Sequence, residues 1–351
     1  MNAGFRTRSI ALLAGVAALL APACSSSEDE GNNTAATPSP TASNVAASAA
    51  CAAGGDAALT TLELTVDGTV RTAVVHVPLG ATGTEPLPVV LSFHGAAEMA
   101  ENRSMVDEFT SLGDQHGFIS VYPQGLVGDA GSVSGVTGWD IAGTAVDEPA
   151  FVAALLDELG AKVCIDESRV YAAGLSNGGG MALLLACELS DRIAAVASVA
   201  GAPLEAGCKG DTKPVPTISF HGFDDAIVPY AGSAPSGGPF LPVVDVMAAR
   251  AAINGCTGEP TVDAVTPTAE RNTWNGCSAP VILYTLEDHG HAWPGHPLPV
   301  SQTELASFMD PTILGFSGMT PDELAANMLL TNTSVDASAL IWEFFDLSSR
   351  A

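Results

Sequence analysis

The segment from Arg169 to Arg192 constrains the fold of this chain more than any other stretch. An apolar run typical of a buried strand, VYAAGL, leads to Ser176, and the residues that follow, NGGGMALLLACEL, have helical periodicity. Gly174 and Gly178 stand two residues before and two residues after the serine. The segment therefore predicts a strand, a sharp turn and a helix, with Ser176 either as a nucleophile at the turn or as the cap of the helix.

The same alternation of strand and helix patterns extends over most of the chain. Nearly continuous apolar runs predict buried parallel strands, and segments with one apolar side predict helices. This order predicts an α/β fold, a mostly parallel sheet with helices on both faces. The strand patterns cover residues 69–78, 87–95, 118–125, 169–175, 193–203, 215–225 and 280–295, and the helix patterns cover residues 108–117, 149–160, 177–189 and 336–347.

The first 55 residues are set apart by their composition. Two arginines precede a short apolar stretch that ends in small residues, which predicts a secretory signal peptide over residues 1–23. A tether rich in Ser, Thr, Ala and Pro follows over residues 24–55, and residues 56–351 are expected to form one domain. The arrangement resembles a bacterial lipoprotein with a lipid on Cys24, and plain secretion is the alternative.

The charge of the chain bears on its partners. The formal net charge is −27, with 12 Lys and Arg against 39 Asp and Glu. Such a surface repels phosphate backbones, so a nucleic-acid partner is not expected. We expect a secreted or cell-surface protein of a bacterial envelope. It is expected to be a monomer that contacts the membrane only through the lipid anchor.

Six of the seven cysteines lie beyond Cys24, and an even number in an exported protein predicts disulfides. One pair is predicted between the cysteines before the strand and at the end of the helix that flank Ser176, because both should lie at the same end of the layer. A second pair flanks a region rich in Gly, Pro and Asn, and the third is left by elimination. The predicted pairs are, in this order, Cys164–Cys187, Cys256–Cys277 and Cys51–Cys208.

Polar residues follow the carboxyl ends of several predicted strands, which is the edge where ligands bind in such sheets. Ser176 lies in GLSNG, which matches the nucleophile elbow G-x-S-x-G. A serine nucleophile needs a base that a carboxylate orients, and both are expected on later loops. The segment HGFDDAIVPY supplies the acid; Asp225 is preferred, although spacing alone hardly separates it from Asp224.

The loop after the last predicted strand, EDHGHAWPG, supplies the base. His291 is preferred to His289 and to His296, because the glycine before it allows a tight loop. A lone histidine is usually structural, but this one lies downstream of a matching aspartate.

The end of the strand at residues 87–95 predicts an oxyanion hole. The backbone N–H groups of Ala96 and Asn177 could hold a developing negative charge. The ring of His94 is expected to support this loop, and His94, Trp139 and Trp293 are candidate pocket residues. No H-E-x-x-H, paired C-x-x-C, P-loop or well-placed G-x-G-x-x-G spacing occurs, so no metal or cofactor is expected.

Several segments together resemble a known family. LSFHGAAEMAEN, GFISVYPQG, CIDESRVYAAGLSNGGGMALLLACELSDRIAAVASVAG, HGFDDAIVPY, GHAWPG and DASALIWEFF follow in order along the chain. They resemble the secreted polyhydroxybutyrate depolymerase-like and feruloyl or acetylxylan esterase-like proteins (carbohydrate esterase family 1 and relatives), which implies the α/β-hydrolase fold and serine esterase chemistry. The family patterns G-L-S-N-G-G, H-G-x-x-D-x-x-V-P and G-H-x-W-P-G place the nucleophile on Ser176, the acid on Asp225 and the base on His291.

The chain departs from the family pattern at two places. The oxyanion loop of H-G-C-G-G type reads HGAAEMA, with Ala96, Ala97 and Glu98 in place of the cysteine and glycines. A backbone donor survives these changes, whereas the shape of the pocket and the rate are expected to differ from those of the family. The segment over residues 297–330 is longer than the resemblance implies and could form a lid or a substrate-facing loop.

These observations predict an exported serine esterase that acts on feruloyl or acetyl esters of plant polysaccharide, or on related small esters. The nearest alternative keeps the mechanism and takes polyhydroxybutyrate or its oligomers as substrate. A secreted peptidase of the same fold is less favoured, because no gating domain precedes the hydrolase. An alternative of another class is an inactive hydrolase fold that serves as a surface binding lipoprotein, supported only by the altered oxyanion loop.

Overall fold

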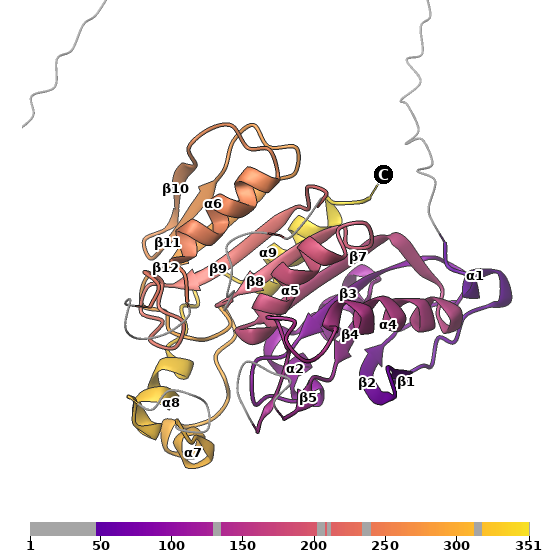
Figure 1. Cartoon of the computed structure of the whole chain (residues 1–351), viewed down its shortest axis with the longest axis horizontal. Helices are drawn as coiled ribbons and strands as arrows, with labels where there is room; N and C mark the ends of the chain where they lie inside the picture. Colours follow the sequence, from indigo (N-terminus) through magenta and orange to yellow (C-terminus); the bar gives the residue numbers. More distant parts are fainter. Residues whose placement is uncertain are drawn as a thin grey trace, which may run out of the picture. The chain divides into compact units, whose positions relative to one another are not determined.

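The computed structural model describes residues 47–128, 135–201, 208, 212–233, 240–311 and 318–350 (Figure 1). Its central element is a ten-stranded sheet in the order β1-β2-β4-β3-β7-β8-β9-β12-β11-β10, and β5 and β6 form a separate pair. The strands are β1 (Thr61–Val66), β2 (Thr69–His76), β3 (Leu87–Phe93), β4 (Ile119–Pro123), β5 (Leu126–Val127), β6 (Thr137–Gly138), β7 (Ile165–Leu175), β8 (Ala195–Val199), β9 (Thr217–Gly222), β10 (Thr261–Thr266), β11 (Ala269–Thr273) and β12 (Val281–Leu286).

Helices pack along this sheet and beyond its carboxyl edge. They are α1 (Ala50–Ala53), α2 (Ala100–Asp107), α3 (Phe109–His116), α4 (Glu148–Lys162), α5 (Asn177–Glu188), α6 (Val243–Ile253), α7 (Gln302–Phe308), α8 (Pro321–Leu329) and α9 (Ala337–Asp346).

The six central strands run parallel to one another, from β4 through β3, β7, β8 and β9 to β12. The outer strands are antiparallel, with β1 and β2 at one edge and β11 and β10 at the other. Every residue of β8 and β9 is buried, because helices cover both faces. The predicted mostly parallel sheet is therefore confirmed.

Alternate residues of β3 show how the two faces are filled. Val89, Leu91 and Phe93 lie in one apolar cluster together with residues of α4 and α5. Val90, which points to the opposite face, lies in a second cluster with residues of α3 and α9. Figure 1 shows α4 and α5 on one side of the sheet and α9 on the other. These two layers hold the carboxyl ends of the central strands in place.

Two of the three predicted disulfides are wrong. The structure joins Cys256 to Cys277 as expected, but it joins Cys51 to Cys164 and Cys187 to Cys208. The predicted pair Cys164–Cys187 assumed that helix and strand end at the same level. The 11 residues of β7 extend about 36 Å, whereas the 12 residues of α5 extend only about 18 Å. Cys187 therefore lies far from the start of β7. The predicted pair Cys51–Cys208 was left by elimination, so it is wrong for the same reason.

The folded unit begins earlier than the predicted tether allows. Residues 47–55 belong to the predicted tether, yet Cys51 is bonded to Cys164 and Ser48 is buried. The Ser48 hydroxyl donates to the Val163 carbonyl at 2.9 Å and accepts the Ile165 N–H at 3.0 Å. These contacts fix the segment to the start of β7. The predicted signal peptide and Cys24 lie outside the described residues.

Within the described residues, no helix has the length and apolar character needed to cross a bilayer.

Candidate active site

The turn between β7 and α5 holds Ser176 in a strained conformation. Its φ of 57° and ψ of −120° lie outside the regions that residues with a side chain readily adopt. The flanking glycines are required by close packing, because a Cβ on Gly174 would overlap the Gly178 carbonyl and a Cβ on Gly178 would overlap the Phe93 carbonyl. The predicted strand, sharp turn and helix are therefore present, with Ser176 at the turn.

The alternative that Ser176 caps α5 is not supported. The residue occupies the N-cap position, yet its side chain accepts no hydrogen bond from the first turn of the helix. Its backbone is satisfied, since its N–H donates to Val199 at 2.9 Å and its carbonyl accepts the Gly180 N–H at 3.0 Å. The half-buried hydroxyl has no hydrogen-bond partner among the residues that the structure describes. It is therefore available to another group.

The loops that follow β9 and β12 bring an aspartate and a histidine together. His291 Nδ1 lies 2.8 Å from Asp225 Oδ2, and both residues are buried. The second carboxylate oxygen of Asp225 accepts the N–H groups of Ile227 at 2.9 Å and Val228 at 2.8 Å. The neighbouring Asp224 is exposed. His291 therefore forms its hydrogen bond with Asp225 and not with Asp224.

The surroundings of Asp225 favour its charged form. Burial alone would raise the pKa of Asp225, but the nearby His291, hydrogen bonds and His221 outweigh it, and the pKa lies well below its ordinary value. An ionised Asp225 accepts the Nδ1–H of His291, which leaves Nε2 of that ring as the basic nitrogen. In the described part of the chain, His291 Nε2 has no hydrogen-bond partner.

The other two histidines of this loop have structural roles. His289 is fully buried; its Nδ1 accepts the Asn332 N–H at 2.9 Å, and its Nε2 lies 3.2 Å from the Ala292 carbonyl. Burial lowers the pKa of His289 to about 4, so this ring is neutral. His296 contacts Asp336 at 3.0 Å and Glu108 at 3.4 Å. In the described part of the chain, neither of these two histidines forms a hydrogen bond with Asp225, whereas His291 does.

The loop after β3 is held by the ring of His94. Gly125 N–H donates to His94 Nε2 at 2.9 Å, so the ring proton is on Nδ1, which donates to the Gly95 carbonyl at 2.7 Å. Burial lowers the pKa of His94, in keeping with a neutral ring. The Gly95 carbonyl and the Ala96 N–H belong to one planar peptide and point in opposite directions. His94 therefore fixes the direction of the Ala96 N–H, which has no acceptor among the described residues.

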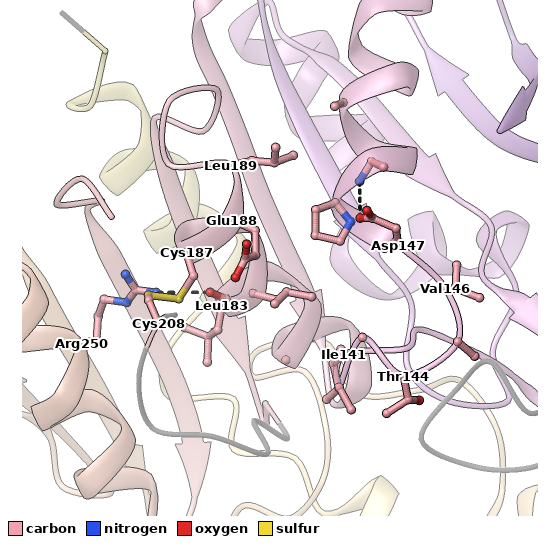
Figure 2. Close-up of a pocket in the computed structure, with 18 of the residues that line it drawn as sticks. Ile141, Thr144, Val146, Asp147, Leu183, Cys187, Glu188, Leu189, Cys208 and Arg250 are labelled. Atoms are coloured by element: carbon pink, nitrogen blue, oxygen red, sulfur yellow. Dashed lines mark hydrogen bonds between the residues drawn. A yellow bond between two sulfur atoms is a disulfide. The ribbon is translucent and has the colours of Figure 1, made fainter. Parts of the chain in front are cut away.

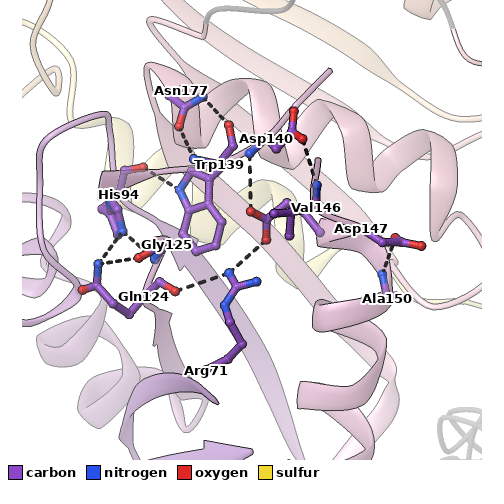
Figure 3. Close-up of polar contacts among 11 residues, drawn as sticks. Arg71, His94, Gln124, Gly125, Trp139, Asp140, Val146, Asp147, Ala150 and Asn177 are labelled. Atoms are coloured by element: carbon purple, nitrogen blue, oxygen red, sulfur yellow. Dashed lines mark hydrogen bonds and ion pairs between the residues drawn. The ribbon is translucent and has the colours of Figure 1, made fainter. Parts of the chain in front are cut away.

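A hydrogen-bond network ties this loop to the turn at Ser176 (Figure 3). The Asn177 side chain exchanges two hydrogen bonds with the backbone of Trp139, at 2.7 Å to its N–H and 3.1 Å to its carbonyl. The Trp139 indole donates to the His94 carbonyl at 2.9 Å. Below the indole, Arg71 forms a buried ion pair with Glu148 at 2.9 Å. The network fixes Ala96 and Asn177, the two predicted oxyanion donors, relative to one another.

The predicted pocket residues are part of the interior instead. His94 and Trp139 are fully buried and Trp293 is 1% exposed. Trp139 packs against Phe93 and Phe151, and the Trp293 indole donates to Ser338 at 2.8 Å. Large aromatic side chains next to Gly or Pro fill the core as often as they face a ligand, and these residues do so here.

Sequence reasoning missed Asn327, a residue of the long segment after His296. In the structure α7 and α8 of that segment pack against each other, and α8 reaches the acid and base loops. The Asn327 side chain donates to the Asp224 carbonyl at 2.6 Å and accepts the Ala226 N–H at 3.1 Å, while its own carbonyl accepts the His291 N–H at 3.1 Å. The unusual length of the segment was the only signal of this role.

A cavity of about 750 Å³ lies apart from these residues, between the loop before α4 and helices α5 and α6 (Figure 2). Arg250 and the Cys187–Cys208 disulfide line one side, and residues 141–147 line the other. Ser176, Asp225 and His291 are not part of its wall. Within the described ranges, no three His, Cys, Asp or Glu side chains gather into a group that could hold a metal ion.

Comparison with known proteins relates the chain to esterases. Residues 72–208 match the family described as esterase PHB depolymerase, a segment that includes Ser176. Feruloyl esterase B of Piromyces equi is 31% identical over 238 residues, which are 63% of this chain and 42% of that protein. Feruloyl esterase C of Emericella nidulans is 31% identical over 171 residues, 47% of this chain and 56% of that protein. The chain spans about half the length of these curated relatives.

A solved structure supports the fold. An acetyl xylan esterase from Aspergillus awamori superposes with a TM-score of 0.51 at 16% identity, over 74% of this chain and 100% of that chain. The protein is an α/β-hydrolase in fold. The resemblance seen in the sequence is confirmed, since part of the chain matches the esterase PHB depolymerase family and parts of two feruloyl esterases.

Proposed function

We propose that this protein is a carboxylic ester hydrolase with Ser176 as nucleophile, His291 as base and Asp225 as the acid that orients the base. One observation carries the proposal: the hydrogen bond between Asp225 and His291 on the loops after β9 and β12. These strands end at the same edge of the sheet as β7, whose end bears the strained Ser176. The order nucleophile, acid, base along the chain is that of α/β-hydrolases.

The first half-reaction forms an acyl-enzyme. His291 Nε2 takes the hydroxyl proton of Ser176 while Oγ attacks the carbonyl carbon of the ester. The negative charge that forms on the carbonyl oxygen is held by the backbone N–H groups of Ala96 and Asn177. The intermediate then expels the alcohol, which receives the proton from His291.

The second half-reaction releases the acid. Water gives a proton to His291 Nε2 and attacks the acyl carbon, and Ser176 leaves with that proton restored. Throughout the cycle Asp225 stays ionised and stabilises the imidazolium, in line with its lowered pKa. Two backbone N–H groups and His221 hold its carboxylate in place.

The relatives bear on the substrate. Two of them are named feruloyl esterases and the superposed structure is an acetyl xylan esterase. We therefore propose feruloyl or acetyl esters of plant polysaccharide, or related small esters, as substrates. Polyhydroxybutyrate or its oligomers are the second candidate, because the family that matches residues 72–208 is the esterase PHB depolymerase family.

We propose that the protein is exported and carries a lipid on Cys24. Three disulfides in the folded unit support an oxidising compartment. Metabolic labelling with palmitate would incorporate label into the wild type and not into Cys24→Ala. Secretion without a lipid would leave both unlabelled.

The proposal is tested by release of p-nitrophenol from acetyl, butyryl and longer acyl esters, together with hydrolysis of methyl ferulate. We expect Ser176→Ala to lower kcat by about 10³-fold or more on the best substrate. A fluorophosphonate probe should label the wild type and not the variant. If neither protein hydrolyses any ester and neither is labelled, the hydrolase is ruled out and the binding lipoprotein becomes the better interpretation.

A further inference from the structure

Glu98 lies beside the candidate nucleophile, in the loop that follows β3. A Cβ built on Gly95 would be 3.4 Å from Glu98 Cδ and 3.5 Å from Ser176 Cβ. The carboxyl group and the serine side chain therefore border the same small space. The Glu98 side chain is 27% exposed, so a molecule that enters from solvent can reach it.

The position of this carboxylate is fixed. Its Oε2 accepts the Gly95 N–H at 2.8 Å and lies 3.5 Å from Arg103 Nη1. The Glu98 backbone is held as well, since its N–H donates to the Gly95 carbonyl at 3.2 Å and its carbonyl accepts the Thr137 hydroxyl at 2.7 Å. A substrate therefore meets a negative charge at a defined place, rather than a side chain that swings freely in solvent.

Arg103 offsets this charge only in part, because its guanidinium is fully buried whereas the Glu98 side chain is 27% exposed to an entering molecule. Its guanidinium is shared with Asp107, whose Oδ2 lies 3.2 Å from Arg103 Nε. Asp107 is fully buried and also accepts hydrogen bonds from the Ser92 hydroxyl and the Phe109 N–H, and burial raises the pKa of this carboxyl group above its ordinary value. One guanidinium thus lies between two carboxyl groups. Glu98 Oε1, the other oxygen, has no partner among the residues described.

We propose that Glu98 makes this site selective by charge, so that it disfavours esters with a carboxylate on the acyl chain and accepts neutral and cationic ones. The inference rests on the proposed ester hydrolysis at Ser176 and goes beyond it, because it concerns which esters react. A second negative charge about 6 Å from Glu98, partly screened by water, lowers kcat/KM roughly threefold to tenfold. A positive charge at the same place is favoured by a similar factor.

Three acyl esters of similar length test the inference: p-nitrophenyl butyrate, mono-p-nitrophenyl succinate and the p-nitrophenyl ester of 4-(trimethylammonio)butyrate. The measurement is kcat/KM for each ester with the wild type, Glu98→Gln and Glu101→Gln. Glutamine keeps an acceptor for the Gly95 N–H and loses the charge. Glu101 is exposed on the same stretch of chain and provides the matched control for a lost charge away from the nucleophile.

We expect Glu98→Gln to raise the rate on the anionic ester relative to the neutral ester by roughly threefold to tenfold and to lower the relative rate on the cationic ester. Glu101→Gln should leave both ratios as in the wild type. Glu98→Ala should shift the ratios in the same direction with a lower rate throughout, because the Gly95 N–H loses its acceptor. If the wild type hydrolyses the neutral ester and both Glu98 variants keep its ratios, the charge selectivity is overturned and the esterase stands. If the wild type hydrolyses no ester, both proposals fall.

Discussion

The carbonyl of Asn327 accepts the N–H of His291 at 3.1 Å, and the side chain of the same asparagine bonds the loop that carries Asp225. One residue of α8 thus spans the loops of the candidate base and the candidate acid. Helix α8 begins with a capping box formed by Thr320 and Glu323, which fixes its start. The long segment after His296 therefore supports the geometry of the site.

Asn327→Ala is expected to lower kcat about tenfold to 10²-fold, because the acid loop loses two hydrogen bonds and a small misplacement of catalytic groups is costly. Stability should fall by only about 1 kcal/mol, since the side chain is half-buried. Steady-state kinetics and urea unfolding measure the two effects. The matched control is Asn275→Ala, which removes side-chain hydrogen bonds to Glu259 and Thr261. Equal losses of activity in both variants would contradict a positioning role.

Asp225→Asn should lower kcat on the best ester by about 10⁴-fold, because the amide can present its N–H to the ring and favour the wrong tautomer of His291. Asp224→Asn removes the same charge from the neighbouring, exposed position and should keep near wild-type kcat. The measurement is kcat of the wild type and of both variants on the same p-nitrophenyl ester. A larger loss in Asp224→Asn than in Asp225→Asn would transfer the role of the acid to Asp224.

The contribution of His289 to the free energy of unfolding is expected to fall as the pH falls from about 6.5 to about 4. Burial lowers the pKa of His289 to about 4, whereas an unfolded histidine has a pKa of about 6.5. Between these values the unfolded chain binds a proton that the folded chain does not, so stability rises with pH and is complete above about 6.5. The contribution of His289 is of the order of 3 kcal/mol.

Urea unfolding across this pH range, with His289→Gln beside His116→Gln, measures that contribution. The first variant should flatten the pH dependence, and the second should keep it, because His116 is exposed. His94, whose pKa burial also lowers, contributes in the same direction and keeps some slope in both proteins. The lowered pKa of Asp225 also stabilises the fold, but this stabilisation is lost only at more acidic pH, where the carboxylate becomes protonated. Equal slopes in the wild type and His289→Gln would contradict the prediction.

The sheet and the contact between Asp225 and His291 could be predicted from the sequence because each depends on local pattern. Continuous apolar runs such as that of β9 are required wherever helices cover both faces. Asp225 and His291 each follow such a run directly, so the topology alone places both at one edge. The family pattern then separated Asp225 from Asp224, and the burial of Asp225 gives the physical reason.

Features that depend on the lengths of elements or on distant contacts could not be predicted in this way. The pairing of Cys164 required the difference in rise per residue between β7 and α5. The contacts of Asn327 join segments far apart in the chain, and only the length of its segment pointed to them. Glu98 departs from the family pattern of the oxyanion loop, but the sequence did not show that its carboxyl group lies beside Ser176. Trp139 is a candidate pocket residue on its sequence alone, but its indole donates to the His94 carbonyl in the core.

The disulfide between Cys51 and Cys164 should stabilise the fold more than that between Cys256 and Cys277. Its loop spans 113 residues against 21, which corresponds to about 5 and about 3 kcal/mol from the entropy of the unfolded chain. Paired Cys→Ala substitutions followed by urea unfolding test the difference. Peptide mapping without reduction tests the connectivity itself, and a peptide that joins Cys164 to Cys187 would contradict the structure.

His94→Ala is expected to lower kcat by about 10²-fold with a smaller change in KM. Without the ring, the Gly95 carbonyl loses the Nδ1–H donor at 2.7 Å and keeps only the Glu98 N–H at 3.2 Å, so the Ala96 N–H of the same peptide is held less firmly toward the oxyanion. The loss falls on the transition state, because the charge on the oxygen develops only there. Kinetics on p-nitrophenyl butyrate separate the two constants, and Gln124→Ala, which removes a weaker 3.3 Å contact to the same ring, serves as comparison. A rise in KM with unchanged kcat would mean that His94 shapes substrate binding and not the oxyanion hole.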